Sequence, residues 1–120
     1  MKIIKRGYSA KDERLIGILR YYARKVAIYL QIRRIPVPGD SIYVWIKEVG
    51  GEMYPKIDID SRNGYEIEYE FDAKTLRLLE PRFIKFVKKD DHFERMKIEK
   101  DDLPLDLQTL HNHIMKALTT

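Results

Sequence analysis

Residues 42–70 read IYVWIKEVGGEMYPKIDIDSRNGYEIEYE, and this stretch decides the fold. Apolar and polar side chains alternate along it with a period of two, which predicts antiparallel strands that bury one face. Gly50 and Gly51 predict a two-residue hairpin turn, because glycine adopts positive φ without steric cost. That turn places Trp45 opposite Lys56, on the face away from the buried isoleucines.

The second turn of this meander admits two registers. A two-residue turn at Asn63-Gly64 would set Ile57 and Ile59 beside glutamates, which a buried face does not tolerate. A three-residue loop, Arg62-Asn63-Gly64, with the glycine in the left-handed position, pairs Ile59 with Ile67 instead. We therefore choose the three-residue loop.

This register has an electrostatic consequence on the other face. It sets Asp60 against Glu66 and Asp58 against Glu68, and each like-charge pair should destabilise the sheet by a fraction of a kcal/mol. We expect some other group to compensate for these pairs.

Two helices should flank the meander. Apolar residues at three- and four-residue spacing predict a long helix from about Ala10 to Arg33, capped by Ser9 and ended by the prolines that follow. A second stripe predicts a C-terminal helix that Asp102 caps, with Pro104 in its first turn. Between them we expect a short helix or helical turn at residues 73–80 and a second hairpin of strands at 82–88 and 93–99. The predicted fold is α+β.

Size and composition restrict the class of protein. The 120 residues predict one domain, 1–120, and no apolar run approaches the roughly 18 residues that cross a bilayer. The chain has no cysteine, which excludes disulfides, thiolate metal ligands and thiol nucleophiles. We expect a cytoplasmic protein without a cofactor, and the 35% charged residues with few amides favour a thermophilic source.

Charge is segregated along the chain. Residues 1–34 hold ten basic and two acidic side chains, a net charge of +8, whereas residues 35–80 hold five basic and ten acidic ones, a net charge of −5. A basic first segment is typical of proteins that bind DNA or RNA, and solvation or pairing with the acidic strands is the alternative. The candidate nucleic-acid-binding residues are Lys5, Arg6, Lys11, Arg14, Arg20, Arg24, Lys25, Arg33 and Arg34.

The acidic hairpin offers a second hypothesis. Carboxylates that converge within a few Å are the ligands that Mg²⁺ prefers, and the candidate set is Asp58, Asp60, Glu66 and Glu68. A helix followed by a meander with acids on its later strands resembles the core of restriction-type nucleases. That family expects a Glu-x-Lys pattern, and the strand at 66–70 has no lysine in register. A metal-dependent nuclease is therefore the enzymatic alternative to a non-enzymatic binding module.

Three aromatic residues, Tyr43, Trp45 and Tyr54, fall on the same outer face as these acids. Large rings in one patch are typical of interface centres, so they predict a homodimer unless a helix covers them. A protein that assembles through surfaces of opposite charge is a third hypothesis.

Other catalytic patterns are missing from the sequence. None of the three serines lies in a nucleophile-elbow motif, and no glycine-rich phosphate loop is present. His111 and His113 are two residues apart on a predicted helix, so their imidazoles point in different directions and do not share a metal ion. We interpret His111 as a partly buried packing residue. These absences favour a binding protein over an enzyme.

Overall fold

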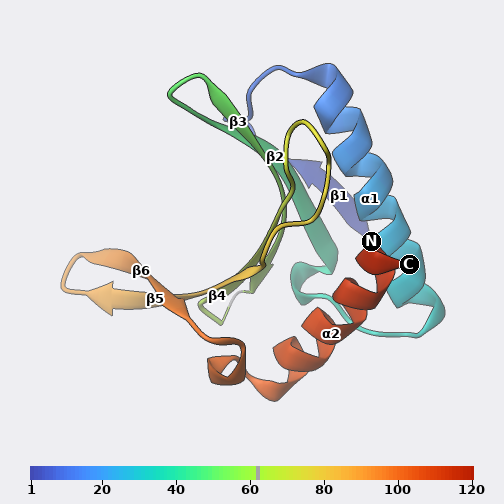
Figure 1. The fold of residues 1–120 in the computed structure, drawn as a ribbon. Helices are drawn as coiled ribbons and strands as arrows, with labels where there is room; N and C mark the ends of the chain where they lie inside the picture. The colour runs from blue at the N-terminus through green and yellow to red at the C-terminus, as the bar shows by residue number, and fades with distance from the viewer. Residues whose placement is uncertain (62) are drawn as a thin grey trace.

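The computed structural model describes residues 1–61 and 63–120, and it confirms the α+β class. A long helix precedes a meander, a second hairpin follows, and a helix ends the chain (Figure 1). The elements are β1 (Lys2–Lys5), α1 (Glu13–Ile32), β2 (Ser41–Val49), β3 (Glu52–Ser61), β4 (Tyr65–Glu70), β5 (Arg82–Lys89), β6 (His92–Ile98) and α2 (Leu105–Thr119), with single 3₁₀ turns at Pro38–Asp40 and Lys100–Asp102.

The strands form one sheet in the order β1-β2-β3-β4-β5-β6. Every neighbouring pair is antiparallel except β1 and β2, which run parallel and are joined through α1. β1 was not predictable from the sequence, because the four-residue run Lys-Ile-Ile-Lys shows no alternation. Its pairing brings the residues that follow it, from Arg6 onward, alongside β2.

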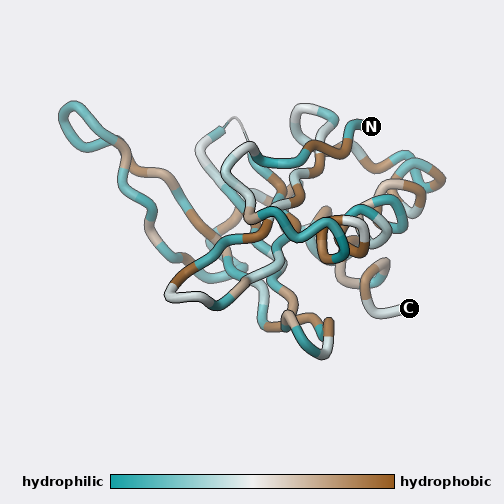
Figure 2. Tube along the Cα trace, turned by 90° about the horizontal axis from the view of Figure 1, so that it is seen from above, coloured by the Kyte–Doolittle hydropathy of each residue, from teal (hydrophilic) through white to brown (hydrophobic). Residues whose placement is uncertain are grey.

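Both helices cover the same face of the sheet, and the sheet curves away from them (Figure 1). Buried aliphatic side chains from α1, α2 and the central strands form the core on that covered face. On the opposite face the described residues form no helix. The hairpin of β5 and β6 stands out from the body and ends in hydrophilic residues (Figure 2).

Both predicted turns of the meander are confirmed by the register. Val49 lies opposite Glu52, and Gly50 and Gly51 adopt φ of +58° and +81°, as a two-residue turn requires. In the next hairpin Ile59 lies opposite Ile67, as the three-residue loop predicts. Gly64 has a φ of +88°, whereas Arg62, also part of that predicted loop, lies outside the described residues.

The predicted start of the first helix is wrong by about three residues. Asp12, and not Ser9, caps α1, and its Oδ1 accepts a hydrogen bond of 3.0 Å from the Leu15 amide. Residues before it are held by the sheet instead: the Ala10 amide donates to the Ile46 carbonyl, and Ser9 Oγ accepts from the Ile46 amide. These contacts with β2 prevent the helix from starting earlier.

Of two further local predictions, one is confirmed in part and one is wrong. Residues 73–80 form no continuous helix, but the Leu76 amide donates to the Asp72 carbonyl at 2.8 Å and closes one helical turn, which Asp72 Oδ1 caps by accepting from the amides of Lys74 and Thr75. Asp102 does not cap α2. Its Oδ2 accepts from the Glu99 amide within the preceding 3₁₀ turn, and Pro104 takes the N-cap position.

Candidate functional site

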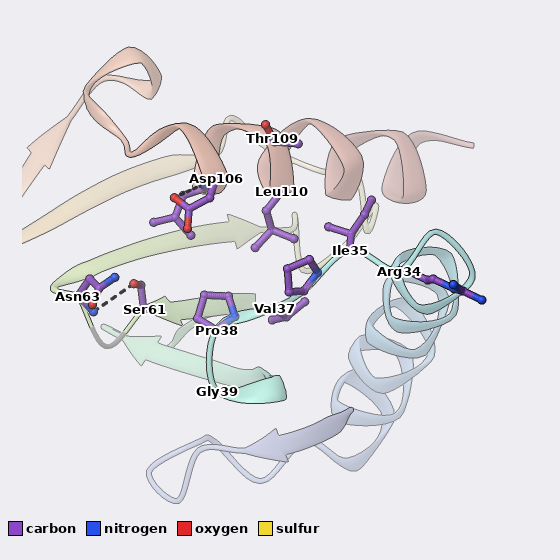
Figure 3. A pocket seen from close by; sticks show the side chains of 12 residues that line it. Arg34, Ile35, Val37, Pro38, Gly39, Ser61, Asn63, Asp106, Thr109 and Leu110 are labelled. Atoms are coloured by element: carbon purple, nitrogen blue, oxygen red, sulfur yellow. Dashed lines mark hydrogen bonds between the residues drawn. The ribbon is translucent and has the colours of Figure 1, made fainter.

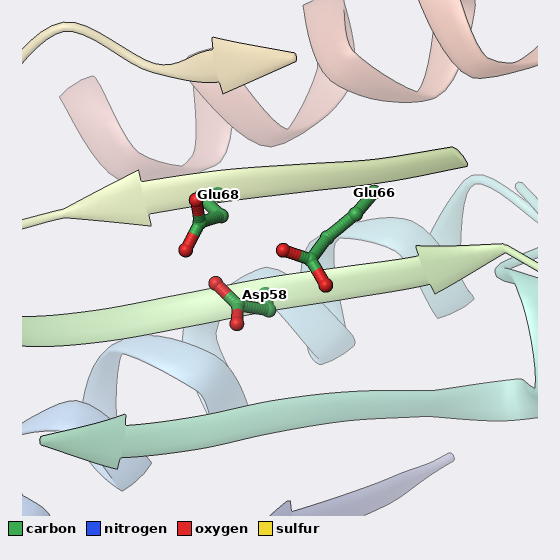
Figure 4. A group of neighbouring side chains, drawn as sticks. All are labelled: Asp58, Glu66 and Glu68. Atoms are coloured by element: carbon green, nitrogen blue, oxygen red, sulfur yellow. The ribbon is translucent and has the colours of Figure 1, made fainter. Parts of the chain in front are cut away.

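Three carboxylates converge on the uncovered face of the sheet. Asp58 on β3 and Glu66 and Glu68 on β4 bring oxygens within 4.8 Å of one another (Figure 4). Their register makes this unavoidable, because Asp58 lies directly opposite Glu68 and its β3 neighbour Asp60 opposite Glu66. The residues are buried, with exposed fractions of 0% for Asp58, 5% for Glu66 and 3% for Glu68. Buried carboxylates at this distance need positive charge nearby.

Three cationic side chains supply that charge. Arg6, in the segment after β1, places Nη2 at 3.5 Å from Asp58 Oδ2 and 3.7 Å from Glu66 Oε2. Arg95 on β6 places Nη2 at 2.7 Å from Glu66 and 3.1 Å from Glu68.

The third cation is Lys56 on β3, and it is itself buried. Its Nζ lies 3.0 Å from Glu68 Oε2 and 3.5 Å from Glu70 Oε1. These contacts are the compensation expected for the like-charge pairs. They come from Arg6, Lys56 and Arg95, whereas the described cations of α1 lie on the other side of the sheet.

Trp45 belongs to the same network. Its Nε1 donates a hydrogen bond to Asp58 Oδ2, and the Tyr8 ring packs edge-on against it with 5.1 Å between ring centroids. Only 7% of Trp45 is exposed. The chain's own N-terminal segment covers this ring, and Tyr43 and Tyr54, on the same face, are half-buried.

Burial shifts the acidity of the network. Loss of hydration raises the pKa of Asp58 well above its ordinary value, and the charges of Glu66 and Glu68 raise it further, against the opposing effect of Arg6. Burial also raises the pKa of Glu66, although Arg95 opposes that shift. Asp58 Oδ1 is also buried, and no described residue gives it a hydrogen bond. Asp58 therefore holds a proton more readily than a solvated aspartate.

The metal hypothesis predicted four ligands, and the structure brings three of them together. Asp60 is at the edge of the cluster, where its carboxylate lies 3.4 Å from Arg6 Nη2. Arg95 Nη2 contacts both glutamates, which is the position that a bridging cation would take. A metal ion would have to displace these side chains, so the geometry favours an ion-pair network over a metal centre.

The basic side chains of α1 have a different environment. Arg14, Arg20 and Arg24 are exposed along one side of the helix, and within the described chain none of them forms an ion pair. Tyr21 lies among them with 67% of its surface exposed. This basic face, Arg14, Arg20, Arg24 and Tyr21, points away from the sheet and its acids.

The other predicted nucleic-acid-binding residues divide into two groups. Lys11 and Arg34 are exposed like the basic face, but Arg6 belongs to the buried network and Lys5 is half-buried in β1. Arg33 and Lys25 are engaged within the chain. The Arg33 guanidinium lies 3.5 Å from the centroid of the Tyr29 ring, and Lys25 Nζ donates to the Thr120 carbonyl.

His111 is a buried packing residue, as predicted. Its Nδ1 lies 2.8 Å from the hydroxyl of Tyr69, and the Phe83 ring packs edge-on against it. Burial lowers the pKa of His111 to about 4, and the charge of Lys100 contributes. Its imidazole is therefore neutral near pH 7.

A cavity of about 520 Å³ lies between the segment 34–39, the end of β3 and α2 (Figure 3). Its floor is apolar, with buried Val37, Leu107 and Leu110. Two of its polar groups are already used by the chain: Ser61 Oγ accepts from the Asn63 amide, and an Asp106 oxygen accepts from the Leu107 amide. Its other polar side chains are those of Arg34, Asn63 and Thr109.

Lys56 and Arg95 were not predicted from the sequence to be members of the network. The contact of Lys56 could have been predicted, because the meander register already placed this lysine beside the acids. The contact of Arg95 could not have been predicted, since it depends on β5 lying next to β4 and β6 next to β5.

Comparison of the chain with protein-family models, curated proteins and solved structures gives no match. Neither helix of the described chain combines the length and the apolar composition that a bilayer crossing requires.

Proposed function

We propose that the protein is a non-enzymatic module that binds nucleic acid through the basic face of α1. The observation that carries this proposal is the separation of charge across the sheet. The acidic strands are paired with Arg6, Lys56 and Arg95, whereas Arg14, Arg20 and Arg24 have no ion-pair partner in the part of the chain described. Internal pairing with the acidic strands therefore does not explain the helix cations.

The spacing of these cations suits a phosphate backbone. At 1.5 Å per residue, Arg14 and Arg24 lie about 15 Å apart along the helix, and Arg20 lies between them. Arg34 and Lys11, near the two ends of α1, extend the positive charge beyond this span. Contacts of this kind bind DNA or RNA without reading sequence, while Tyr21 offers a ring for an unpaired base.

The two other hypotheses have less support. A nuclease needs a metal ion among carboxylates that three cations already contact. A homodimer through the outer sheet face loses its central anchor, because Trp45 is buried. Tyr43 and Tyr54 remain on that face, so self-association stays a proposal that a solution measurement must test.

Fluorescence anisotropy with labelled duplex DNA, single-stranded DNA and RNA tests the proposed function. We expect binding at 50 mM salt. Three phosphate contacts should weaken it at 200 mM salt by about 40-fold for duplex DNA and about 20-fold for a single strand. The triple variant Arg14→Gln, Arg20→Gln, Arg24→Gln should abolish measurable binding.

The matched control removes three positive charges from the projecting hairpin, through Lys88→Gln, Lys89→Gln and Lys97→Gln. It lowers the net charge equally, and its affinity should stay within about threefold of the parent. Equal losses in both triple variants would show that net charge, and not the basic face, drives binding. No binding of any probe at 50 mM salt would overturn the proposal.

A further inference from the structure

A small cavity lies at one end of the uncovered sheet face, beyond the buried ion-pair network. It has a volume of about 230 Å³. The register puts its polar side chains on one face of the sheet, with Lys47 opposite Tyr54 and Lys56 opposite Glu70. The residues that line it are Lys47, Val49, Tyr54, Lys56, Glu70 and Arg82.

The charges of this cavity do not cancel. Glu70 is paired with Lys56 at 3.5 Å, and the same ammonium also contacts Glu68. Lys47 and Arg82 are exposed, and neither forms an ion pair with any residue that the structure describes. Two exposed positive side chains, from β2 and β5, therefore line one concave site together with the buried, paired Lys56.

We propose that this cavity binds the phosphate group of a small phosphorylated molecule. Arg82 offers a planar guanidinium that can hold two phosphate oxygens, and Lys47 offers a compact charge on the opposite side. A doubly charged phosphate monoester matches the two unpaired cations better than a single carboxylate. The volume lies below the 300–1,000 Å³ of drug-sized pockets, so the site takes a phosphate and only a few further atoms.

The walls of the cavity limit what else the ligand carries. Tyr54 presents its ring beside Lys47, but its hydroxyl already donates to Glu52 Oε2 at 2.9 Å. Val49 adds an apolar edge. The remainder of the ligand therefore meets mainly an aromatic ring and an aliphatic side chain. This site is on the face opposite α1, so its ligand does not depend on the basic face.

Titration of the ¹⁵N-labelled protein with inorganic phosphate, at constant ionic strength, tests the site by NMR. The largest amide shifts should occur at Lys47, Tyr54 and Arg82. Lys47→Gln and Arg82→Gln should each weaken phosphate binding at least fivefold, and the double variant should abolish it. Lys88→Gln and Lys97→Gln remove exposed cations outside the cavity and should change the affinity less than twofold. All four side chains are exposed, so the variants should keep the parent's melting temperature.

Two further probes separate the possible sources of the phosphate. Both probes are added to the triple α1 variant, so that the basic face does not contribute to binding. In that background ribose 5-phosphate should bind at least as tightly as a short 5′-phosphorylated oligonucleotide, and adding Lys47→Gln and Arg82→Gln should remove both 5′-phosphate contacts. A clear preference for the oligonucleotide over its 5′-hydroxyl form and over ribose 5-phosphate would replace the small molecule with a nucleic-acid end. Amide shifts that phosphate causes near all surface cations alike would overturn the site. Amide shifts that persist in the double variant would overturn it as well. The triple α1 variant should bind inorganic phosphate like the parent, which distinguishes this result from the proposed function.

Discussion

The indole Nε1 of Trp45 donates a hydrogen bond of 2.5 Å to Oδ2 of Asp58, and both side chains are buried. The two residues are diagonal neighbours across β2 and β3, because Trp45 lies opposite Lys56. A tryptophan on the uncovered face of the sheet thus stabilises a buried carboxylate of the same chain. It holds one oxygen of a carboxylate that has almost no access to water.

Trp45→Phe should destabilise the protein by about 1–3 kcal/mol, because it keeps an aromatic ring and leaves a buried Asp58 oxygen without its donor. Urea denaturation at pH 7 measures the change. Tyr43→Phe is the control, since Tyr43 is half-buried on the same strand, and its effect should stay within about 0.5 kcal/mol. Equal stability of Trp45→Phe and the parent would contradict a role for this hydrogen bond.

Lys56→Gln should cost about 3–5 kcal/mol, because it removes one member of a buried ion pair and leaves Glu68 and Glu70 short of positive charge. Lys47→Gln removes an exposed lysine from the neighbouring strand and should change the free energy of unfolding by less than about 0.5 kcal/mol. Similar costs for the two variants would show that the network contributes no more than a solvated charge.

His111 should make the fold less stable in acid. Its pKa is about 4 in the folded chain and about 6.5 in the unfolded one, so the unfolded state binds more protons between these values. The contribution of His111 to stability should therefore fall as the pH drops from 6.5 towards 4. Urea denaturation across this range should show a smaller loss for His111→Gln, and an NMR titration midpoint near 6.5 would contradict the prediction.

Asp58 should affect stability in acid in the direction opposite to His111. Its raised pKa means that the folded chain binds the proton more tightly than the unfolded chain does. Its contribution therefore becomes more favourable as the pH falls through its folded pKa, and levels off near the ordinary value of 3.8. Asp58→Asn removes this gain, so its stability should fall more steeply with acid than the parent's does. Identical pH profiles would show that Asp58 is ionised like a solvated aspartate.

Self-association through the outer sheet face predicts a dimer in size-exclusion chromatography with light scattering. The double variant Tyr43→Ser, Tyr54→Ser should shift the protein towards monomer, because it removes the two half-buried rings of that face. Trp45→Phe should leave the mass unchanged, since Trp45 is covered within the chain. A parent protein that stays monomeric at high concentration would contradict the dimer.

Local features were predictable where a short stretch of sequence decides them. The pairing of Ile59 with Ile67 follows from alternation and from one glycine turn. The start of α1 was not predictable in this way, because Ser9 and Asp12 are both good caps and only the contacts of residues 9 and 10 with β2 choose between them. After Asp72 only one helical turn forms, although three leucines in the following residues imitate a longer helical stripe.

The sequence by itself determined the two helices, the meander register and the convergence of Asp58, Glu66 and Glu68, because each depends on side-chain period and turn chemistry within about 30 residues. Only the tertiary structure decided which cations meet those acids. Arg6 and Arg95 reach them from segments 52 positions before Asp58 and 29 positions after Glu66, since β1 pairs with β2 and the β5–β6 hairpin lies beside β4. Ion pairs are set by distance in space, and a one-dimensional charge pattern shows the total charge of a segment but not its neighbours.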